Sequence, residues 1–172
     1  VLDRNLSKLC WEGPGDEHES TANQQPASFV TSMAWLDAVR ERFAASGRKF
    51  DPHLFAGHSM GEFTAAVAAG SLDFEEGLLL VAERGRLMGE AGTANPGGMA
   101  SILGLPEAKV LEICAEASKQ GYVGLANANC DGQSVISGYL KPLTTAIELA
   151  EKAKARKVVR LPISIGSHSP LM

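Results

Sequence analysis

The segment 57–61 reads Gly-His-Ser-Met-Gly, a G-x-S-x-G pattern that constrains the fold more than any other part of this chain. An apolar segment, 53–56, precedes it, and an alanine-rich segment free of Gly and Pro, 62–69, follows it. Strand, tight turn and helix in this order are the setting in which G-x-S-x-G forms a nucleophile elbow. We therefore expect a buried strand over 53–56, a strained turn at 57–61 and a helix behind the turn.

Ser59 is the nucleophile that such an elbow would present, because the turn places it at the apex with its hydroxyl exposed. The amide of Met60 would point toward an oxyanion developing on a bound carbonyl group. The two glycines suit a turn that is strained and whose backbone approaches a helix closely. Ser59 is thus predicted to be catalytic and Met60 to belong to the oxyanion hole.

A serine nucleophile needs a general base, and His168 is the candidate. It lies in the polar loop 166–170 directly after a predicted strand, and a loop suits a residue that must reach across to Ser59. A surface histidine in a polar turn is the alternative interpretation. His58 is nearer in sequence, but adjacent side chains diverge at an elbow, so a packed or supporting role fits it better.

No third member of a catalytic triad is evident. Hydrolases with this elbow usually order their residues Ser, then Asp or Glu, then His. Asp73 and Asp131 lie between Ser59 and His168, but one opens a predicted helix and the other sits in a predicted turn. A Ser–His dyad oriented by a backbone carbonyl is the simpler prediction.

Arg84 is the second informative residue, because it falls on the apolar face of a predicted helix over 73–91. That face is predicted to carry Leu80, Val81, Leu87 and Met88. An unpaired buried charge is costly. Arg84 therefore either pairs with a carboxylate of this chain or serves as a fork for a substrate carboxylate, which a guanidinium binds in bidentate fashion. Glu83, Arg86 and Glu90 fall on the opposite side as solvated charges.

Composition sets the class of protein. With 172 residues, 45% hydrophobic and 21% charged, the chain suits one globular domain or a core with an insert. A net charge of −4 gives no reason to expect nucleic-acid binding, and no apolar run reaches membrane-spanning length. The three cysteines, odd in number and widely spaced, indicate reduced thiols of a cytoplasmic protein without a metal site.

Residues 1–25 are expected to be mostly irregular, with an acidic run over 16–19, and a helix follows from Pro26 to Ala45. From residue 97 onward the pattern changes to alternating strands and helices. The predicted elements are strands over 99–105, 122–128, 134–139 and 157–163 and helices over 106–117 and 142–155. Their order, βαββαβ, is that of a split ferredoxin-like unit. We expect a partial catalytic core over 1–94 and 165–172 and a ferredoxin-like subdomain over 95–164.

Two polar groups have both an ordinary and a functional interpretation. The basic cluster comprises Lys152, Lys154, Arg156, Lys157 and Arg160. Such a cluster is usually the solvated end of a helix favoured by its dipole, and docking of an acidic partner is the alternative. Asn127, Asn129 and Gln133 border a predicted turn, where asparagine is expected for conformational reasons, and the lining of a cleft is the alternative.

Taken together, these motifs resemble the malonyl-CoA:acyl-carrier-protein transacylases and the acyltransferase domains of polyketide and fatty acid synthases. The matching segments are 9–14, 24–27, 57–62, 83–88, 127–133 and 167–172. They occur in order and span the whole chain, which makes the resemblance more specific than a lone elbow. Met60 and the loop around His168 look like those of the malonyl-preferring, stand-alone bacterial enzymes.

The resemblance implies an α/β-hydrolase-like core with an inserted ferredoxin-like subdomain. It also implies that Ser59 attacks the thioester of malonyl-CoA with His168 as base, while Arg84 holds the free carboxylate and the Met60 amide supports the oxyanion. The phosphopantetheine thiol of acyl carrier protein would then take the acyl group, without a metal or redox cofactor. Gln25 and Asn129 are implied substrate contacts.

Two family features are missing from the 172 residues. A glycine- and glutamine-rich strand that supplies a second oxyanion amide would precede Val1, and the carbonyl that orients the histidine would follow Met172. We therefore expect the chain to be a fragment that exposes apolar surface and is poorly stable alone.

Two other functions stay open at this point. A serine esterase or thioesterase would use the same elbow but would have no use for the guanidinium of Arg84. A non-catalytic module that binds acyl carrier protein, or an inactive fragment, would bind the carrier without labelling of Ser59.

Overall fold

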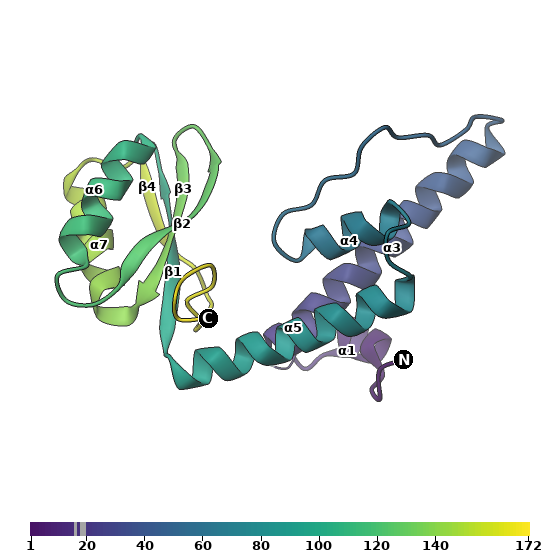
Figure 1. Cartoon of the computed structure of the whole chain (residues 1–172), viewed down its shortest axis with the longest axis horizontal. Coiled ribbons are helices and arrows are strands. Elements are labelled where there is room, and N and C mark those ends of the chain that lie inside the picture. The colour runs from purple at the N-terminus through teal and green to yellow at the C-terminus, as the bar shows by residue number, and fades with distance from the viewer. Residues whose placement is uncertain (16, 18–19) are drawn as a thin grey trace. The chain divides into compact units, whose positions relative to one another are not determined.

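In the computed structural model, the described part of the N-terminal half of the chain is helical, whereas all the described strands lie in the C-terminal half together with two helices (Figure 1). The structure describes residues 1–15, 17 and 20–172, so most of the acidic run expected over 16–19 lies outside the described residues. The chain divides into two compact units, Val1–Leu87 and Met88–Met172. We describe each unit by itself.

The first unit begins with a short helix where irregular structure was expected. Helix α1 (Leu6–Glu12) starts because the Asn5 side chain accepts a hydrogen bond from the amide of Lys8 at 2.9 Å, and it ends at Gly13, whose φ is 76°. An asparagine cap and a glycine stop are therefore enough to define this helix.

Helix α3 (Thr21–Ala45) begins five residues before Pro26, where the sequence predicted its start, so Pro26 lies inside the helix. Proline has no N–H and cannot bond to the carbonyl four residues earlier, that of Ala22. The Arg4 Nη2 atom donates to this carbonyl at 2.7 Å, and Nη1 donates to the Asn23 side chain. A side chain from the N-terminal segment thus satisfies the group that the proline leaves open.

Helices α4 (Gly61–Ala68) and α5 (Phe74–Ala94) complete the helices described in the first unit, and α5 continues past Leu87 into the second. The buried core of the first unit is small: Phe29, Met33, Leu78 and Val81. Gly77 allows close packing, since a Cβ there would lie 2.6 Å from the Val67 side chain. Large apolar side chains such as Trp11 and Trp35 remain exposed.

The strand predicted over 53–56 is wrong. In the described residues this segment belongs to no helix or strand, and Leu54 is 79% exposed. A strand needs a neighbour for its N–H and C=O groups, and all four strands of the described chain lie in the second unit.

The second unit is built on an antiparallel four-stranded sheet in the order β2-β3-β1-β4. Its elements are β1 (Gly97–Leu103), α6 (Glu107–Ala117), β2 (Val123–Cys130), β3 (Gln133–Tyr139), α7 (Leu140–Lys152) and β4 (Lys157–Arg160). The predicted order of strands and helices is confirmed, and β1 lies at the centre of the sheet between β3 and β4.

Two boundaries differ from the prediction for local reasons. Strand β2 extends to Cys130, so only Asp131 and Gly132 form the turn to β3, and Gly132 has a φ of 73° that suits glycine. Strand β4 ends at Arg160 rather than at residue 163. Pro162, which cannot donate to a ladder, follows closely and limits the strand.

Helices α6 and α7 pack against each other and against the sheet, and together they bury the larger core. Its fully buried side chains include Ile102, Val110, Ile136 and Leu143. The thiol of Cys114 lies in this core, and burial raises its pKa to about 11, so it stays protonated at neutral pH. The second unit therefore has a continuous interior of its own.

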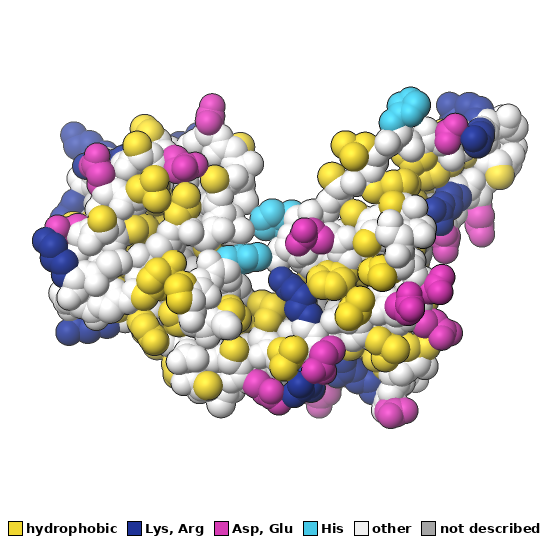
Figure 2. All heavy atoms as spheres, viewed as in Figure 1, with side chains coloured by type: hydrophobic (Ala, Val, Ile, Leu, Met, Phe, Trp, Pro, Cys, Tyr) yellow, Lys and Arg dark blue, Asp and Glu magenta, His cyan; other side chains and the backbone are white. Residues whose placement is uncertain are grey.

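The surface of the second unit carries the basic cluster. Lys152, Lys154, Arg156, Lys157 and Arg160 are all exposed, and Figure 2 shows dark blue side chains grouped over this part of the unit. Their exposure is consistent with the solvated end of a helix, and docking of an acidic partner stays a prediction. Among the described residues, no helix has the length and apolar character that crossing a membrane requires.

Candidate functional site

The predicted elbow turn is confirmed at Ser59, whose φ of 55° lies in the left-handed region that non-glycine residues rarely adopt. The Gly61 amide donates to the His58 carbonyl at 2.9 Å, and the Glu62 amide donates to the Ser59 carbonyl at 3.2 Å. These bonds close the turn and start α4 directly behind it. Strain of this kind at a single polar residue is typical of a functional site.

Gly57 makes the elbow possible. A Cβ atom at this position would lie 1.9 Å from the carbonyl oxygen of Gly61, so no other residue fits without a rearrangement of the turn. A Cβ at Gly61 itself would meet nothing within 4 Å. Glycine is therefore required at position 57 because a Cβ atom does not fit there, whereas the space around Gly61 would accommodate one.

Arg84 of α5 binds Ser59, the predicted nucleophile. Its Nη2 atom donates to Ser59 Oγ at 2.9 Å, and its Nη1 atom donates to the Oε1 atom of Gln25. Gln25 is only 7% exposed, and its Nε2 atom donates to Thr21 Oγ1 at 2.8 Å. The structure thus brings together three residues singled out from the sequence, Ser59, Arg84 and Gln25, and adds Thr21.

The guanidinium of Arg84 is partly buried, and burial lowers its pKa from the ordinary value, while the nearby charge of Glu62 acts in the opposite direction. Its hydrogen bonds to Gln25 and Ser59 go to neutral oxygen atoms, and among the described residues no ion pair involves it. The intramolecular ion pair considered from the sequence is therefore not found. A cation held in this way favours an anionic group beside the serine, either an alkoxide or a bound carboxylate.

The face of α5 that carries Arg84 is less apolar than predicted. Val81 is fully buried, but Leu80 and Leu87 are 45% and 49% exposed, and Leu78 takes their place in the core. The first unit has too few packing partners to cover the whole stripe. On the solvated side, Arg86 pairs with Glu83 at 2.7 Å, as expected for exposed charges.

Met60 precedes the first residue of α4 as its N-cap. The turn uses the amides of Gly61 and Glu62, and in the described part of the chain the Met60 amide donates no backbone hydrogen bond. Amides at a helix N-terminus are oriented toward anions. The geometry agrees with an oxyanion-hole role for Met60, which stays a prediction.

His168 belongs to the second unit and is exposed, with a φ of 56°. Its loop is tied down on both sides: Ser169 Oγ donates to the Gly166 carbonyl at 2.5 Å, and the Asn95 side chain donates to the Leu171 carbonyl at 3.3 Å. A second strained residue in an anchored loop is consistent with a functional histidine. Its role as base for Ser59 stays a prediction, because the two residues belong to different units.

Asn129 also lies in the second unit, near the end of β2. It falls at a shift of the strand register between Ala128 and Cys130 and is exposed. The position is therefore an irregularity of a strand rather than the turn that the sequence predicted. A substrate contact there stays a prediction.

Thr21 was not singled out from the sequence. It stands four residues before Gln25 on one helix face, and Gly85 directly follows Arg84, but neither spacing by itself indicates a contact between the two helices. A Cβ at Gly85 would lie 2.6 Å from the Thr21 carbonyl oxygen, so α5 touches the first turn of α3 next to Arg84. This close contact brings Arg84 within reach of Gln25.

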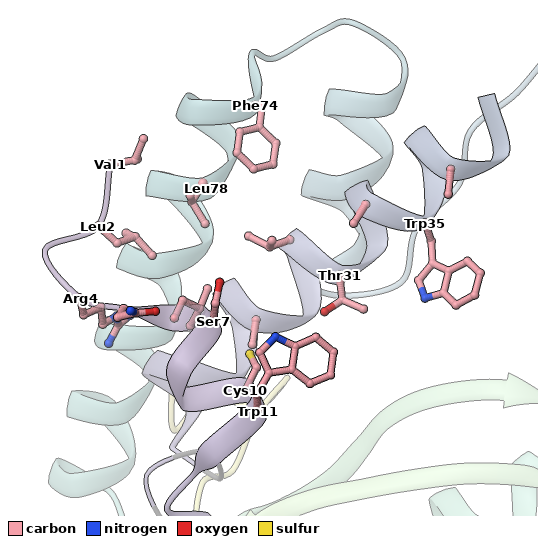
Figure 3. Close-up of a pocket in the computed structure, with 16 residues that line it drawn as sticks. Val1, Leu2, Arg4, Ser7, Cys10, Trp11, Thr31, Trp35, Phe74 and Leu78 are labelled. Carbon is pink, nitrogen blue, oxygen red and sulfur yellow. The ribbon is translucent and has the colours of Figure 1, made fainter. Parts of the chain in front are cut away.

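An apolar hollow in the first unit is a separate feature. It has a volume of about 1110 Å³ and lies among α1, α3 and α5 (Figure 3). Its lining is mainly apolar and includes Leu2, Trp11, Val30, Trp35 and Leu78. None of Ser59, Arg84 and Gln25 lines it. Its size does not make it the reactive site, because the polar groups that could do chemistry are elsewhere.

Comparison with known proteins gives a consistent result. The family model described as acyl transferase domain matches residues 2–172. The malonyl CoA-acyl carrier protein transacylase of Bacillus subtilis is 42% identical over 173 residues, which cover all of this chain and 53% of that protein. The chain thus spans about half the length of the curated relatives it matches.

Solved structures agree. An acyl-carrier-protein S-malonyltransferase from Burkholderia pseudomallei matches 99% of this chain and 54% of its own, with 38% identity and a TM-score of 0.85. A malonyl-transacylase in complex with a type II PKS acyl carrier protein matches 97% of this chain and 52% of its own, with 35% identity and a TM-score of 0.87.

Proposed function

The chain belongs to the acyl transferase domain family, and from this we propose that it takes part in the transfer of a malonyl group from malonyl-CoA to the phosphopantetheine thiol of acyl carrier protein. The observation that carries the proposal is the hydrogen bond from Arg84 to Ser59 Oγ at 2.9 Å. This bond places the positive charge of Arg84 next to the hydroxyl of Ser59. A malonyl thioester has one carbonyl to be attacked and one free carboxylate to be held, and the pair Ser59 and Arg84 matches both.

In the first half-reaction, the Ser59 hydroxyl loses its proton and attacks the thioester carbonyl of malonyl-CoA. The negative charge that forms on the carbonyl oxygen is stabilised by the Met60 amide. The carbon–sulfur bond then breaks, CoA leaves as the thiol, and malonyl remains as an ester on Ser59. Arg84 transfers the hydrogen bond that it makes to Ser59 to the malonyl carboxylate, a group that a guanidinium can bind through two parallel bonds.

In the second half-reaction, the phosphopantetheine thiol of acyl carrier protein attacks the ester of Ser59. His168 is proposed to take the proton of the attacking group in each half-reaction and to return it to the leaving group. Both halves exchange an ester and a thioester, so the proposed cycle is ping-pong and uses no metal and no redox cofactor. Gln25 and Asn129 remain proposed contacts around the acyl group.

We also propose a finer description of the fold. Residues 1–94 and 165–172 would form part of an α/β-hydrolase-like core, and 95–164 a ferredoxin-like subdomain. The sheet order β2-β3-β1-β4 with its two crossover helices supports the second assignment. The strained turn at Ser59 supports the first, since a nucleophile elbow belongs to that fold.

A serine esterase for neutral acyl chains is less well supported. Such an enzyme gains nothing from a partly buried guanidinium on its nucleophile, and the curated relatives are named as malonyl transacylases. A module that only binds the carrier would have no need for a strained serine.

The test is the intact mass of the natural protein after brief incubation with malonyl-CoA, with acetyl-CoA and the Ser59→Ala variant alongside. We expect a malonyl adduct on the wild-type protein, little acetyl adduct, and no adduct on the variant. A wild-type protein that is labelled at Ser59 by a fluorophosphonate but takes no malonyl group would refute the proposed substrate. Absence of both reactions, with retained binding of acyl carrier protein, would support the non-catalytic module instead.

A further inference from the structure

The carboxylate site has a support that the reaction itself does not use. Arg84 is held by Gln25, and Gln25 is held by Thr21, so that a chain of three hydrogen bonds runs from Thr21 to Ser59. Ser59 and Arg84 have roles in the proposed chemistry, and Gln25 is a proposed contact around the acyl group, but Thr21 has no role in either. The question is what Thr21 contributes.

Chemistry fixes the orientation of the Gln25 amide. A guanidinium has only donors, so the Gln25 atom that faces Arg84 has to be the carbonyl oxygen. The amide nitrogen then points the other way, toward Thr21 Oγ1 at 2.8 Å, where the hydroxyl oxygen accepts. If the amide were reversed, its N–H groups would face the N–H groups of Arg84. Thr21 and Arg84 therefore select the same orientation of Gln25 from opposite ends.

The surrounding structure keeps Thr21 in place. The first turn of α3 is held by Arg4, which donates to the Ala22 carbonyl at 2.7 Å and to Asn23. Gly85 lies against the Thr21 carbonyl, where a Cβ would approach to 2.6 Å. Gln25 is 7% exposed, so a lost partner would not be replaced freely by bulk water.

We propose that Thr21 is a positioning residue of the carboxylate site: its hydroxyl fixes the Gln25 amide, and Gln25 fixes the guanidinium of Arg84 beside Ser59. The inference rests on the proposed function and deepens it, because it assigns part of the selectivity for a dicarboxylic acyl group to a threonine that touches neither the acyl group nor the nucleophile. Thr21 acts through Gln25 alone.

The experiment compares Thr21→Val, which keeps the shape and removes the hydroxyl, with Thr21→Ser, which restores it. Thr144→Val is the matched control, because the Thr144 hydroxyl of α7 donates to the Leu140 carbonyl in the same helix, at 2.9 Å. The measurement is kcat/KM for malonyl-CoA and for acetyl-CoA on the natural protein. We expect Thr21→Val to lower the malonyl-to-acetyl ratio roughly tenfold, mainly through KM for malonyl-CoA. Thr21→Ser and Thr144→Val are expected to stay within about twofold of wild type.

A double-mutant cycle separates positioning from general stability. In a Gln25→Met background, Thr21→Val should have no further effect on the ratio, because its target amide is gone. Additive effects of the two changes would overturn the proposal, and so would an unchanged ratio in Thr21→Val. A parallel loss of malonyl and acetyl transfer with altered circular dichroism would also overturn it in favour of a structural role.

A second readout keeps this inference distinct from the proposed reaction. Free malonate should protect Ser59 from a fluorophosphonate, and the half-protecting concentration should rise roughly tenfold in Thr21→Val. If the wild-type protein transfers no acyl group but malonate protects Ser59 with this dependence on Thr21, the proposed function fails and the positioning role stands. If malonate protects both proteins equally, the positioning role fails.

Discussion

The unit Met88–Met172 closes its core with a four-stranded sheet and two helices, whereas the unit Val1–Leu87 has a core of four buried side chains. The difference is visible at the surface. Trp11, Trp35 and Leu54 of the first unit are 87%, 70% and 79% exposed, and no large apolar residue described in the second unit exceeds 46%. Exposure of this extent marks a surface that another part of a protein would cover.

The predicted nucleophile and the residues that bind it lie in the unit with the smaller core. Ser59, Arg84 and Gln25 all belong to the first unit, where hydrogen bonds and glycine contacts fix them more than apolar packing does. The second unit supplies the predicted base, His168, on an anchored loop. The comparison shows that the geometry of a site can be set locally even where the surrounding core is thin.

The elbow should be the most sensitive point of the first unit. Gly57→Ala would place a Cβ 1.9 Å from the Gly61 carbonyl, so we expect the rate of Ser59 labelling by a fluorophosphonate to fall more than about a thousandfold. Gly61→Ala, with nothing within 4 Å of its Cβ, should retain most of the rate. Equal losses in the two variants would show that the motif needs its glycines for flexibility rather than for space.

The autonomy of the second core can be tested within the 172-residue chain. Both tryptophans lie in the first unit, so tryptophan fluorescence follows that unit in a urea titration, while alkylation of the buried thiol of Cys114 follows the second. We expect two separate transitions. Ile136→Ala should lower the unfolding free energy of the second by about 3 kcal/mol.

The matched control for this change is Leu111→Ala, because Leu111 is 46% exposed and its loss should stay within about 0.5 kcal/mol. A single transition that both probes report, shifted as a whole by Ile136→Ala, would show that the two units depend on each other for stability.

The carboxylate fork should give a smaller and more selective effect. Arg84→Ala removes the charged partner of the acyl carboxylate, and a hydrogen bond to a charged group contributes about 1.5–3 kcal/mol. We therefore expect kcat/KM for malonyl-CoA to fall roughly thirtyfold while acetyl transfer changes little. Arg86→Ala is the control on the same helix, since Arg86 pairs with the exposed carboxylate of Glu83. A loss of acetyl transfer as large as that of malonyl transfer would contradict the fork.

The order of elements in the second unit was predictable because each strand and helix has its own apolar period and turn residues. The absence of a strand over 53–56 was not predictable, because a strand depends on neighbours that its own sequence does not contain. In the site, the G-x-S-x-G motif predicted the turn at Ser59. The position of Arg84 on the apolar face of a predicted helix predicted that its charge is paired or binds a substrate carboxylate. Thr21 carries no such signal, since its role depends on a contact between α3 and α5 that only the fold creates.

The φ of 55° at Ser59 also restricts which side chains this position can accept. A threonine would carry the same hydroxyl, but its branched Cβ is poorly tolerated in the left-handed region. A cysteine is unbranched and meets no such obstacle. The backbone of the elbow therefore disfavours threonine, although threonine keeps the attacking oxygen. It tolerates cysteine, although cysteine replaces that oxygen with sulfur.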